Sequence, residues 1–291
     1  MPQIEFAEVD IYGSPKLKAR VAELVGSEFG GTQSADSILR MIDFASGTTK
    51  VMGGFVGDEL VSMNAFMRMP FRRDDEVFTG FQSGFSATDT NHRGKGYWPR
   101  LMTFAEAELA RSGASFIFGF PNPVSHPLFV KKLRYTSLEL YNRRIVCAPL
   151  VFGNAFTAAA SKEEHALRPD VDDNIGWKTR SDEAHAVVVV TSDAGTLWGK
   201  VRERRKYGVP LKYLEIGSFE LRPGGQLRDL FRLAARRAKV RLIYVSMNPE
   251  NLYFPLIRFH QYGQPIIIKP LADFDPGAGP LNIFGGLRDT F

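Results

Sequence analysis

The sequence has few of the residues that build metal centres and disulfide frameworks. Cys147 is the single cysteine, so we expect neither an internal disulfide nor a cysteine-based zinc site. The five histidines never occur as HxH or HxxxH, which argues against a metal site on a helix. The composition therefore predicts a protein without a bound metal.

Long apolar runs are also absent. No stretch approaches the ~18 consecutive apolar residues of a membrane span. The opening residues, MPQIEFAEVD, lack the apolar run of a signal peptide. We therefore expect a cytoplasmic protein that has no membrane partner.

Charge of one sign is nowhere concentrated in a long run. The 37 basic and 32 acidic residues leave a net charge of +5. This balance argues against nucleic acid as a partner and suits a local basic site for an anionic ligand. The densest basic stretch, KVRERRKYG at 200–208, has the composition of a solvated helix face.

Three common catalytic signatures are missing. GxSxG does not occur, so serine-hydrolase chemistry has no support. GxxxxGK[ST] does not occur either, and GKGYWP at 94–99 lacks the third glycine of GxGxxG. These absences exclude a P-loop and argue against a dinucleotide fingerprint.

The chain is long enough for two domains. Its 291 residues exceed the ~100–200 residues of one domain. A weakly patterned stretch at 151–176 resembles a linker. We therefore predict one domain at 1–150 and a second at 177–291.

The first half alternates between helical and strand-like spacing of its apolar residues. Helices are predicted at 15–30, 35–46 and 97–113, with a short one beginning near Ser125. Strands are predicted at 50–57, 59–69, 76–88, 115–120 and 135–146. This order predicts an α/β fold with a mixed sheet.

An internal repeat links the two halves. Five apolar positions of the predicted helix at 97–113 return 129 residues later: Trp98, Leu101, Met102, Ala105 and Leu109 become Leu227, Leu230, Phe231, Ala234 and Ala238. Arg93 and Gly96 return at the same offset as Arg222 and Gly225. Because the matches keep their order, they favour two copies of one fold.

A basic loop with two glycines, RGKG at 93–96, leads into the helix that opens with Tyr97 and Trp98. The first backbone N–H groups of a helix have no intrahelical acceptor, and the helix dipole favours negative charge there. Glycines let a phosphate approach the backbone closely. The loop therefore predicts an anion site, with a plain solvated turn as the alternative.

This order of segments resembles the GNAT (GCN5-related N-acetyltransferase) superfamily. RGKGYW at 93–98 resembles the family's [Q/R]-x-x-G-x-[G/A] signature, and NPVSHPLFVKKLRYTSL at 122–138 resembles its later segment led by asparagine. The resemblance covers about residues 1–148, and the repeat extends a weaker version of it to the end.

The resemblance implies acyl-coenzyme A as co-substrate. The loop amides would hold its diphosphate, and its pantetheine arm would lie between two splayed strands, along Phe85 to Thr88. The residues implied in coenzyme binding share the loop and the preceding strand: Phe85, Ser86, Ala87, Arg93, Gly94, Lys95, Gly96, Tyr97 and Trp98.

Several positions depart from the family pattern. Trp98 stands where the signature has Gly or Ala, and its place in the apolar stripe predicts a ring turned into the core. Phe129 stands where many relatives carry a tyrosine acid, and Gln82 and Ser83 stand where relatives often keep a glutamate base. The usual acid/base pair is therefore missing.

His126 is the candidate proton acceptor, because the helix dipole disfavours imidazolium in the first turn of a helix. The alternative is that His126 caps the helix or packs beside Pro127, with water taking the proton. Asn122 has two open roles: its side chain either orients a ligand or caps its own loop.

We therefore predict tandem GNAT-like domains, the C-terminal copy degenerate, that transfer an acyl group from acyl-CoA to the amine of a small polar acceptor. A nucleotide-linked amino sugar is the first candidate, and amino acid or aminoglycoside amines are alternatives. The other class of function is a non-catalytic module that binds acyl-CoA or an acyl carrier. We expect a monomer or a homodimer.

Overall fold

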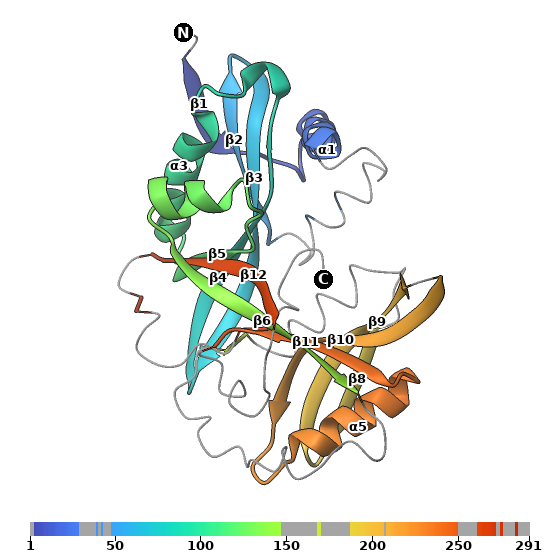
Figure 1. The fold of residues 1–291 in the computed structure, drawn as a ribbon. Helices are drawn as coiled ribbons and strands as arrows, with labels where there is room; N and C mark the ends of the chain where they lie inside the picture. Colours follow the sequence, from blue (N-terminus) through green and yellow to red (C-terminus); the bar gives the residue numbers. More distant parts are fainter. Residues whose placement is uncertain are drawn as a thin grey trace. The chain divides into compact units, whose positions relative to one another are not determined.

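The computed structural model describes residues 3–28, 48–146, 187–206, 208–249 and 261–271, with the short stretches 39, 42, 168–169, 274–275 and 283–284. The chain splits into two compact units (Figure 1). Unit 1 comprises 1–70, 78–137 and 266–275, and unit 2 comprises 71–77, 138–265 and 276–291.

Unit 1 is built on a mixed sheet with the strand order β1-β2-β3-β4-β5-β12. Its strands are β1 (Ile4–Glu8), β2 (Lys50–Val56), most of β3 (Glu59–Arg73) and of β4 (Glu76–Thr88), β5 (Phe116–Gly119), and the second half of β12 (Gln261–Pro270). Neighbours pair antiparallel from β1 to β3, and β4 runs parallel to β5. The α/β fold class predicted from the sequence is confirmed.

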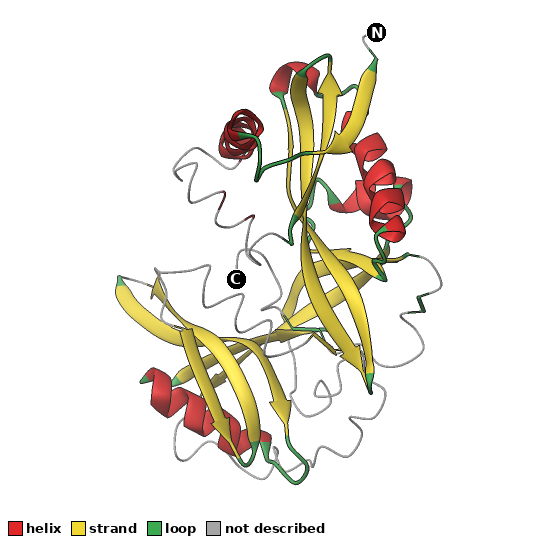
Figure 2. Cartoon of the chain, turned by 180° about the vertical axis from the view of Figure 1, so that it is seen from behind, coloured by secondary structure: helices red, strands yellow, loops and turns green. Residues whose placement is uncertain are grey.

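Two helices cover opposite faces of this sheet (Figures 1 and 2). α1 (Pro15–Glu28) has proline at its first helical position. Ser14 caps it, because its hydroxyl accepts a hydrogen bond from the N–H of Leu17 at 3.3 Å. α3 (Tyr97–Arg111) lies on the other face. Its predicted stripe is buried at Leu101, Met102, Ala105 and Leu109, and each such leucine contributes roughly 1.5–3 kcal/mol by leaving water.

Unit 2 repeats part of this topology. Its sheet has the order β6-β11-β10-β9-β8, and β10 runs parallel to β11 as β4 does to β5. The elements are β6 (Thr136–Val146), β8 (Val187–Ser192), β9 (Gly195–Lys206), β10 (Val209–Leu221), α5 (Leu227–Ala238) and β11 (Leu242–Met247). β7 (Arg168–Pro169) pairs with the end of β3.

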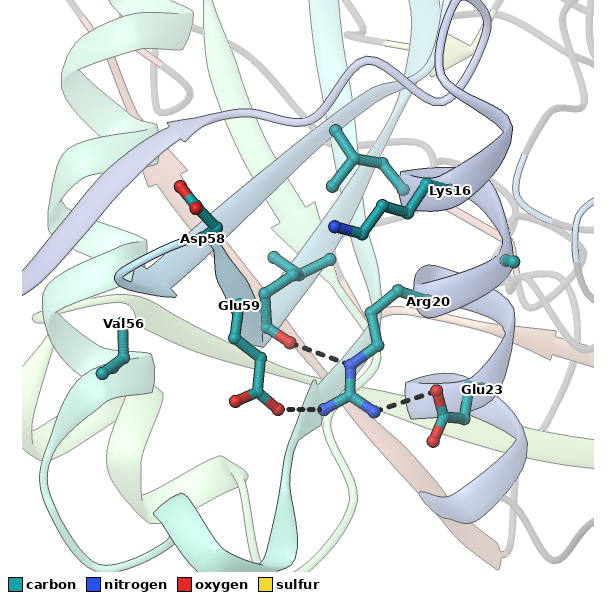
Figure 3. Close-up of a pocket in the computed structure, with 9 residues that line it drawn as sticks. Lys16, Arg20, Glu23, Val56, Asp58 and Glu59 are labelled. Atoms are coloured by element: carbon teal, nitrogen blue, oxygen red, sulfur yellow. Dashed lines mark hydrogen bonds and ion pairs between the residues drawn. The ribbon is translucent and has the colours of Figure 1, made fainter.

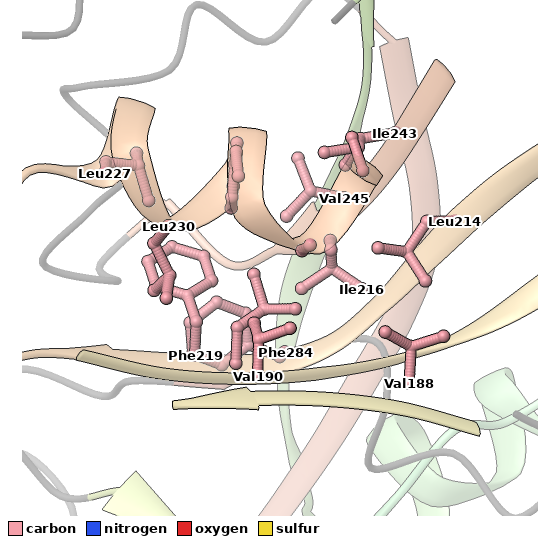
Figure 4. Close-up of a cluster of buried hydrophobic side chains, with 14 of the residues drawn as sticks. Val188, Val190, Leu214, Ile216, Phe219, Leu227, Leu230, Ile243, Val245 and Phe284 are labelled. Carbon is pink, nitrogen blue, oxygen red and sulfur yellow. The ribbon is translucent and has the colours of Figure 1, made fainter. Parts of the chain in front are cut away.

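The core of unit 2 lies between α5 and its strands (Figure 4). Leu230, Phe231 and Ala234 are buried there, at the repeat positions of Leu101, Met102 and Ala105. The apolar stripes of α3 and α5 are therefore both buried, each in the core of its own unit.

Each unit takes one strand from the other half of the sequence. β12, near the C-terminal end of the chain, pairs antiparallel with β5 of unit 1, with Ile267 opposite Gly119. β6, from the first half, pairs antiparallel with β11 of unit 2, with Tyr141 opposite Met247. The sequence division into 1–150 and 177–291 stays a prediction, but the compact units do not follow it strand by strand.

The prediction of a helix face at 200–208 is wrong. These residues belong mainly to β9, which pairs antiparallel with β10 along its length. Lys200 is buried, and Arg202 pairs with Glu215 of β10 at 3.1 Å. Arginine, lysine and glutamate favour helices in isolation, and pairing with β10 overrides that preference.

Some predictions fall on parts of the chain outside the described residues. The helix predicted at 35–46 does so except for Leu39 and Ile42, and the linker at 151–176 does so except for β7. In the described part of the chain, no helix is long and apolar enough to cross a membrane. Nor does that part hold a group of three or more His, Cys, Asp or Glu side chains placed to bind a metal.

Candidate functional site

β4 continues past the end of its parallel neighbour. Its pairing with β5 runs from Gly80 opposite Phe116 to Ser83 opposite Gly119, where β5 ends. β4 extends five residues further, to Thr88. Within this extension Phe85 has a φ of +52°, which is unusual for a residue with a side chain. The predicted residues Phe85, Ser86 and Ala87 therefore lie on an irregular strand end beyond β5.

The loop after β4 is held by a capped turn. Asp89 caps the short helix η1 (Thr90–His92), and its Oδ1 accepts from the N–H of Asn91 at 2.9 Å. Gly94 and Gly96 follow with φ values of +75° and +71°. This left-handed conformation is one that glycine adopts without strain.

The space around both glycines is open. A Cβ atom added at Gly94 or Gly96 would meet no heavy atom within 4 Å. Gly96 is the N-cap of α3 and supplies no side chain to its first N–H groups, and the first turn of α3 has no acidic residue. An uncapped helix start with an open approach suits an anion such as a phosphate.

The second loop of the repeat differs at the matching positions. The N–H of Gly225 donates to the carbonyl oxygen of Arg222 at 2.8 Å. A Cβ atom added at Gly225 would lie 2.1 Å from the carbonyl oxygen of Ala194, so the backbone there is already in close contact. The first turn of α5 contains the acidic Asp229. This loop therefore has less room and a less favourable charge for an anion than the loop before α3.

Arg93 is engaged with its own unit. Its Nη2 forms an ion pair with Glu28 of α1 at 2.6 Å, and its Nε donates to the carbonyl oxygen of Thr88 at 3.1 Å. The side chain is about half exposed, at 49%. Arg93 therefore links the ends of α1 and β4, while Lys95 is exposed in the same loop.

The two aromatic residues at the start of α3 have packing roles. Tyr97 is buried against Ile4 and Val61. Trp98 packs edge to face on Phe129, with 5.0 Å between ring centroids. The prediction that the Trp98 ring turns toward the core is confirmed, and Phe129 is buried there beside it. The two rings therefore pack the start of α3, which follows the open loop, against the core.

Asn122 caps its own turn. Its Oδ1 accepts from the N–H groups of Val124 at 3.0 Å and of Ser125 at 2.8 Å. The hydroxyl of Ser125 accepts in return from the N–H of Asn122 at 3.1 Å. Of the two roles left open for Asn122, these bonds favour the cap, and contact with a ligand stays a prediction.

His126 begins the turn that leads into the π-helix η2 (Leu128–Lys132). Its Nε2 lies 2.8 Å from the hydroxyl of Ser137. The ring is partly exposed. When Nε2 carries the hydrogen of this bond, Nδ1 is left with a free lone pair, which is the form that takes up a proton.

Sequence reasoning missed the role of Arg20. This α1 residue lines a cavity of about 650 Å³ between α1 and the β2–β3 hairpin (Figure 3). Its guanidinium binds four oxygens: of Glu23 at 2.9 Å, Glu59 at 3.2 Å, Asp89 at 2.8 Å and the Leu60 carbonyl at 3.1 Å. The sequence carries no local signal for the contacts with Glu59, Leu60 and Asp89, because these partners lie 39 to 69 positions away.

The cavity does not include the predicted site residues. The loop before α3 stays the candidate anion site, because it has the open glycines and the uncapped helix start. The guanidinium of Arg20 is already surrounded by acceptors. Arg20 connects the two places, since its bond to Asp89 holds the turn that precedes the loop.

Residues 16–136 match the family model described as "Acetyltransferase (GNAT) domain". Among solved structures, the chain is similar to a GCN5-related N-acetyltransferase from Kribbella flavida, at 13% identity and a TM-score of 0.64, over 92% of this chain and 71% of that chain. It is also similar to a conserved protein of Enterococcus faecalis V583 titled a probable N-acyltransferase, at 12% identity and a TM-score of 0.60, over 92% and 72%.

A third similar structure is that of Eis1 from Mycobacterium abscessus, at 12% identity and a TM-score of 0.57, over 92% of this chain and 74% of that chain. At such identities the likeness shows the fold. No curated protein matches the chain.

Proposed function

We propose that this N-acyltransferase binds the diphosphate of acyl-CoA at the loop 93–98, because residues 16–136 match the model of the GNAT acetyltransferase domain. The observation that supports this most is the open loop itself. Gly94 and Gly96 leave space beside the backbone, and the uncapped start of α3 supplies the positive end of a helix dipole.

The end of β4, where it extends beyond its neighbour β5, would receive the acyl arm. β4 extends beyond β5 from residue 84 to residue 88, so its backbone groups are not all used by that neighbour. In our proposal an N–H of the stretch 85–87 donates to the thioester oxygen, which gains negative charge as the amine attacks. The loop and the strand end are contiguous in the chain, so one coenzyme can reach both.

The reaction is a simple acyl transfer. The amine nitrogen of the acceptor forms a bond to the thioester carbon, and the carbon–sulfur bond then breaks. The proton lost by the amine goes to Nδ1 of His126 or to water, and the coenzyme leaves as a thiolate that takes up a proton. Alignment of the two substrates supplies a further part of the rate, up to ~7–11 kcal/mol in well-oriented reactions.

The acceptor we propose is a small polar amine, with a nucleotide-linked amino sugar as the first candidate. Amino acids and aminoglycosides are the alternative acceptors of the same chemistry. A module that binds acyl-CoA without turnover is the competing function, and the absence of Tyr and Glu at the positions of Phe129 and Gln82 favours it.

Two measurements on the purified protein separate these functions. Native mass spectrometry reveals a co-purified coenzyme and the mass of its acyl group. Thiol release is then followed with acetyl-CoA and longer acyl-CoAs against a panel of amino sugars, amino acids and aminoglycosides. We expect release that depends on one amine class. Coenzyme binding with no release from any acceptor would support the non-catalytic module, and no binding at all would reject the proposal.

A further inference from the structure

A group of buried polar side chains lies on the neighbouring strands β3 and β4. Ser62 and Asn64 of β3 and Ser83 of β4 are all buried. Their neighbours on β3, such as Val61, Met63 and Ala65, are buried and apolar. Because a buried polar group costs free energy unless it is hydrogen bonded, such a group in a strand interior calls for a specific use.

Asn64 bonds to residues on both sides of the irregular position Phe85. Its Nδ2 donates to the hydroxyl of Ser83 at 3.1 Å, and its Oδ1 accepts from the hydroxyl of Ser86. Nδ2 also donates to the carbonyl oxygen of Ala65 at 3.0 Å. A carbonyl oxygen only accepts, so this bond fixes which end of the amide faces each serine.

The spacing of the two serines depends on the left-handed residue between them. Residues three apart in a regular strand point to opposite faces. Ser83 and Ser86 nevertheless both reach Asn64, because Phe85 interrupts the extended backbone with a φ of +52°. Asn64 can make both bonds only while the strand keeps this interruption, so the bonds favour it over a regular strand.

A second contact from β3 holds the end of the same segment. The hydroxyls of Ser62 and Thr88 lie 2.9 Å apart. Ser62 and Asn64 are two positions apart, so they lie on one face of β3. Between them they fix the β4 segment from Ser83 to Thr88, which is the segment that extends beyond β5.

We propose that Asn64 is a positioning residue for acyl transfer: through Ser83 and Ser86 it holds the irregular end of β4 so that a backbone N–H of residues 85–87 faces the thioester oxygen. This inference rests on the proposed function. Asn64 is fully buried, so in this proposal it acts through the strand and not by contact with the coenzyme. A displacement of ~1 Å at a reacting centre is enough to slow a reaction by about 100-fold, so a residue that only holds the strand affects the rate strongly.

The test compares Asn64→Ala, Ser86→Ala and the double variant. The loop at 93–98 stays intact in all three, so the dissociation constant of adenosine 3′-phosphate 5′-diphosphate, the part of CoA without the pantetheine arm, is expected to change by no more than about twofold. The kcat of each single variant is expected to fall about 10- to 100-fold. Because both substitutions break the same contact, the double variant should be no slower than the slower single variant.

Ser218→Ala is the matched control for a mere loss of stability. Ser218 is a buried strand serine of unit 2, and its hydroxyl accepts from Nε1 of Trp198 at 2.7 Å. We expect this variant to keep its kcat within about twofold of wild type although it too loses a buried hydrogen bond. Ser86→Ala removes one hydroxyl from a half-buried site, so it remains informative if Asn64→Ala does not fold.

Each result decides between the inference and the proposed function. If Ser86→Ala keeps a full kcat, or the two single losses multiply in the double variant, the positioning role is overturned while the function stands. Loss of binding of adenosine 3′-phosphate 5′-diphosphate together with kcat also overturns it, because Asn64 would then support the loop at 93–98 and not the strand end alone. A wild-type protein that neither binds CoA nor releases thiol overturns the proposed function instead.

Discussion

Arg20 of α1 donates a hydrogen bond from Nη2 to Oδ2 of Asp89 at 2.8 Å, and both side chains are only 20% exposed. Asp89 is the residue that caps the turn before the loop at 93–96. The first helix is thus tied to the candidate coenzyme loop by one charged contact. Glu28, the last residue of α1, forms an ion pair with Arg93 of the loop.

The contact predicts a pH dependence of stability. The hydrogen bond from Arg20, followed by the one from the N–H of Asn91, lowers the pKa of the Asp89 carboxyl below its usual value of about 3.9. A lowered pKa in the folded state stabilises the fold above the unfolded-state pKa, and this stabilisation is lost as the pH falls through the folded-state pKa.

We therefore expect Asp89→Asn to have a lower Tm than wild type above about pH 5, with the difference shrinking below about pH 4. Thermal unfolding followed from pH 3 to pH 7 measures this. Asp75→Asn serves as the control in a hairpin turn. A Tm difference for Asp89→Asn that is the same at pH 3 and pH 7 would rule out the contact as its cause.

Gly96 and Gly224 make a matched pair for the coenzyme site. They have φ values of +71° and +76°, and a Cβ atom at either would meet nothing within 4 Å. A glutamate at either position therefore carries the same backbone strain, of about 1–2 kcal/mol. Near the start of α3, however, its carboxylate would occupy and repel the site of a diphosphate.

We expect Gly96→Glu to raise the dissociation constant of CoA at least about 100-fold, which is ~2.7 kcal/mol. Gly224→Glu should leave it unchanged and shift the Tm by a similar amount. Isothermal titration calorimetry with CoA and thermal unfolding provide the two readouts. Equal affinities in the two variants would remove the loop before α3 from coenzyme binding.

His126 is tested by a pair of variants that separate proton transfer from hydrogen bonding. His126→Gln keeps a side chain able to bond Ser137 but takes up no proton, whereas His126→Ala loses both functions. General-base catalysis contributes typically ~10²–10⁴-fold, so both variants should lower kcat/KM by at least about 100-fold. Recovery of rate with Gln alone would assign His126 a structural role, and full activity of His126→Ala from pH 6 to pH 9 would make water the base.

Lys269 of β12 tests how much the strand from the second half of the sequence contributes to the stability of unit 1. Its Nζ lies 2.6 Å from Glu106 of α3 and donates to the carbonyl oxygen of Leu133 at 2.8 Å. Lys269→Met leaves the carboxylate of Glu106 largely buried without its cation, since that side chain is 11% exposed. We expect a loss of about 2–4 kcal/mol in the free energy of unfolding.

Urea denaturation measures this loss, with two comparisons. Lys212→Met removes an exposed lysine from its pair with Glu203, at 3.8 Å, and should cost less than about 1 kcal/mol. Adding Glu106→Gln to Lys269→Met should recover at least half of the loss, because the buried charge is gone. If the double variant is less stable than Lys269→Met, the charge pair is not the cause.

Much of the fold could be predicted from local patterns. The boundaries of β4 and the start of α3 agree with the predicted segments 76–88 and 97–113, because alternation and helical spacing report which face of an element is buried. The loop glycines were predictable as well, since the helix start and the two positive φ values require residues without a side chain.

The site was predictable only in outline. Arg93 could be assigned to the loop from the sequence, but its ion pair with Glu28 spans 65 positions and has no local signature. The same holds for Asn64, whose polar side chain in an apolar strand becomes meaningful only beside Ser83 and Ser86. The helix predicted at 200–208 was wrong for a related reason, because its strand partner β10 is not part of the local pattern.

The amino-acid sequence by itself determined the bounds of β4, the start of α3, the buried stripes of α3 and α5, and which loop suits an anion, because these depend on neighbours within a few residues. The tertiary structure alone decided that β12 pairs with β5 and β6 with β11, and that Arg20 contacts Asp89, Asn64 contacts Ser83, and Lys269 contacts Glu106. Strand pairing and buried polar contacts join residues far apart in the chain, and the free energy that selects them arises only when the chain has folded.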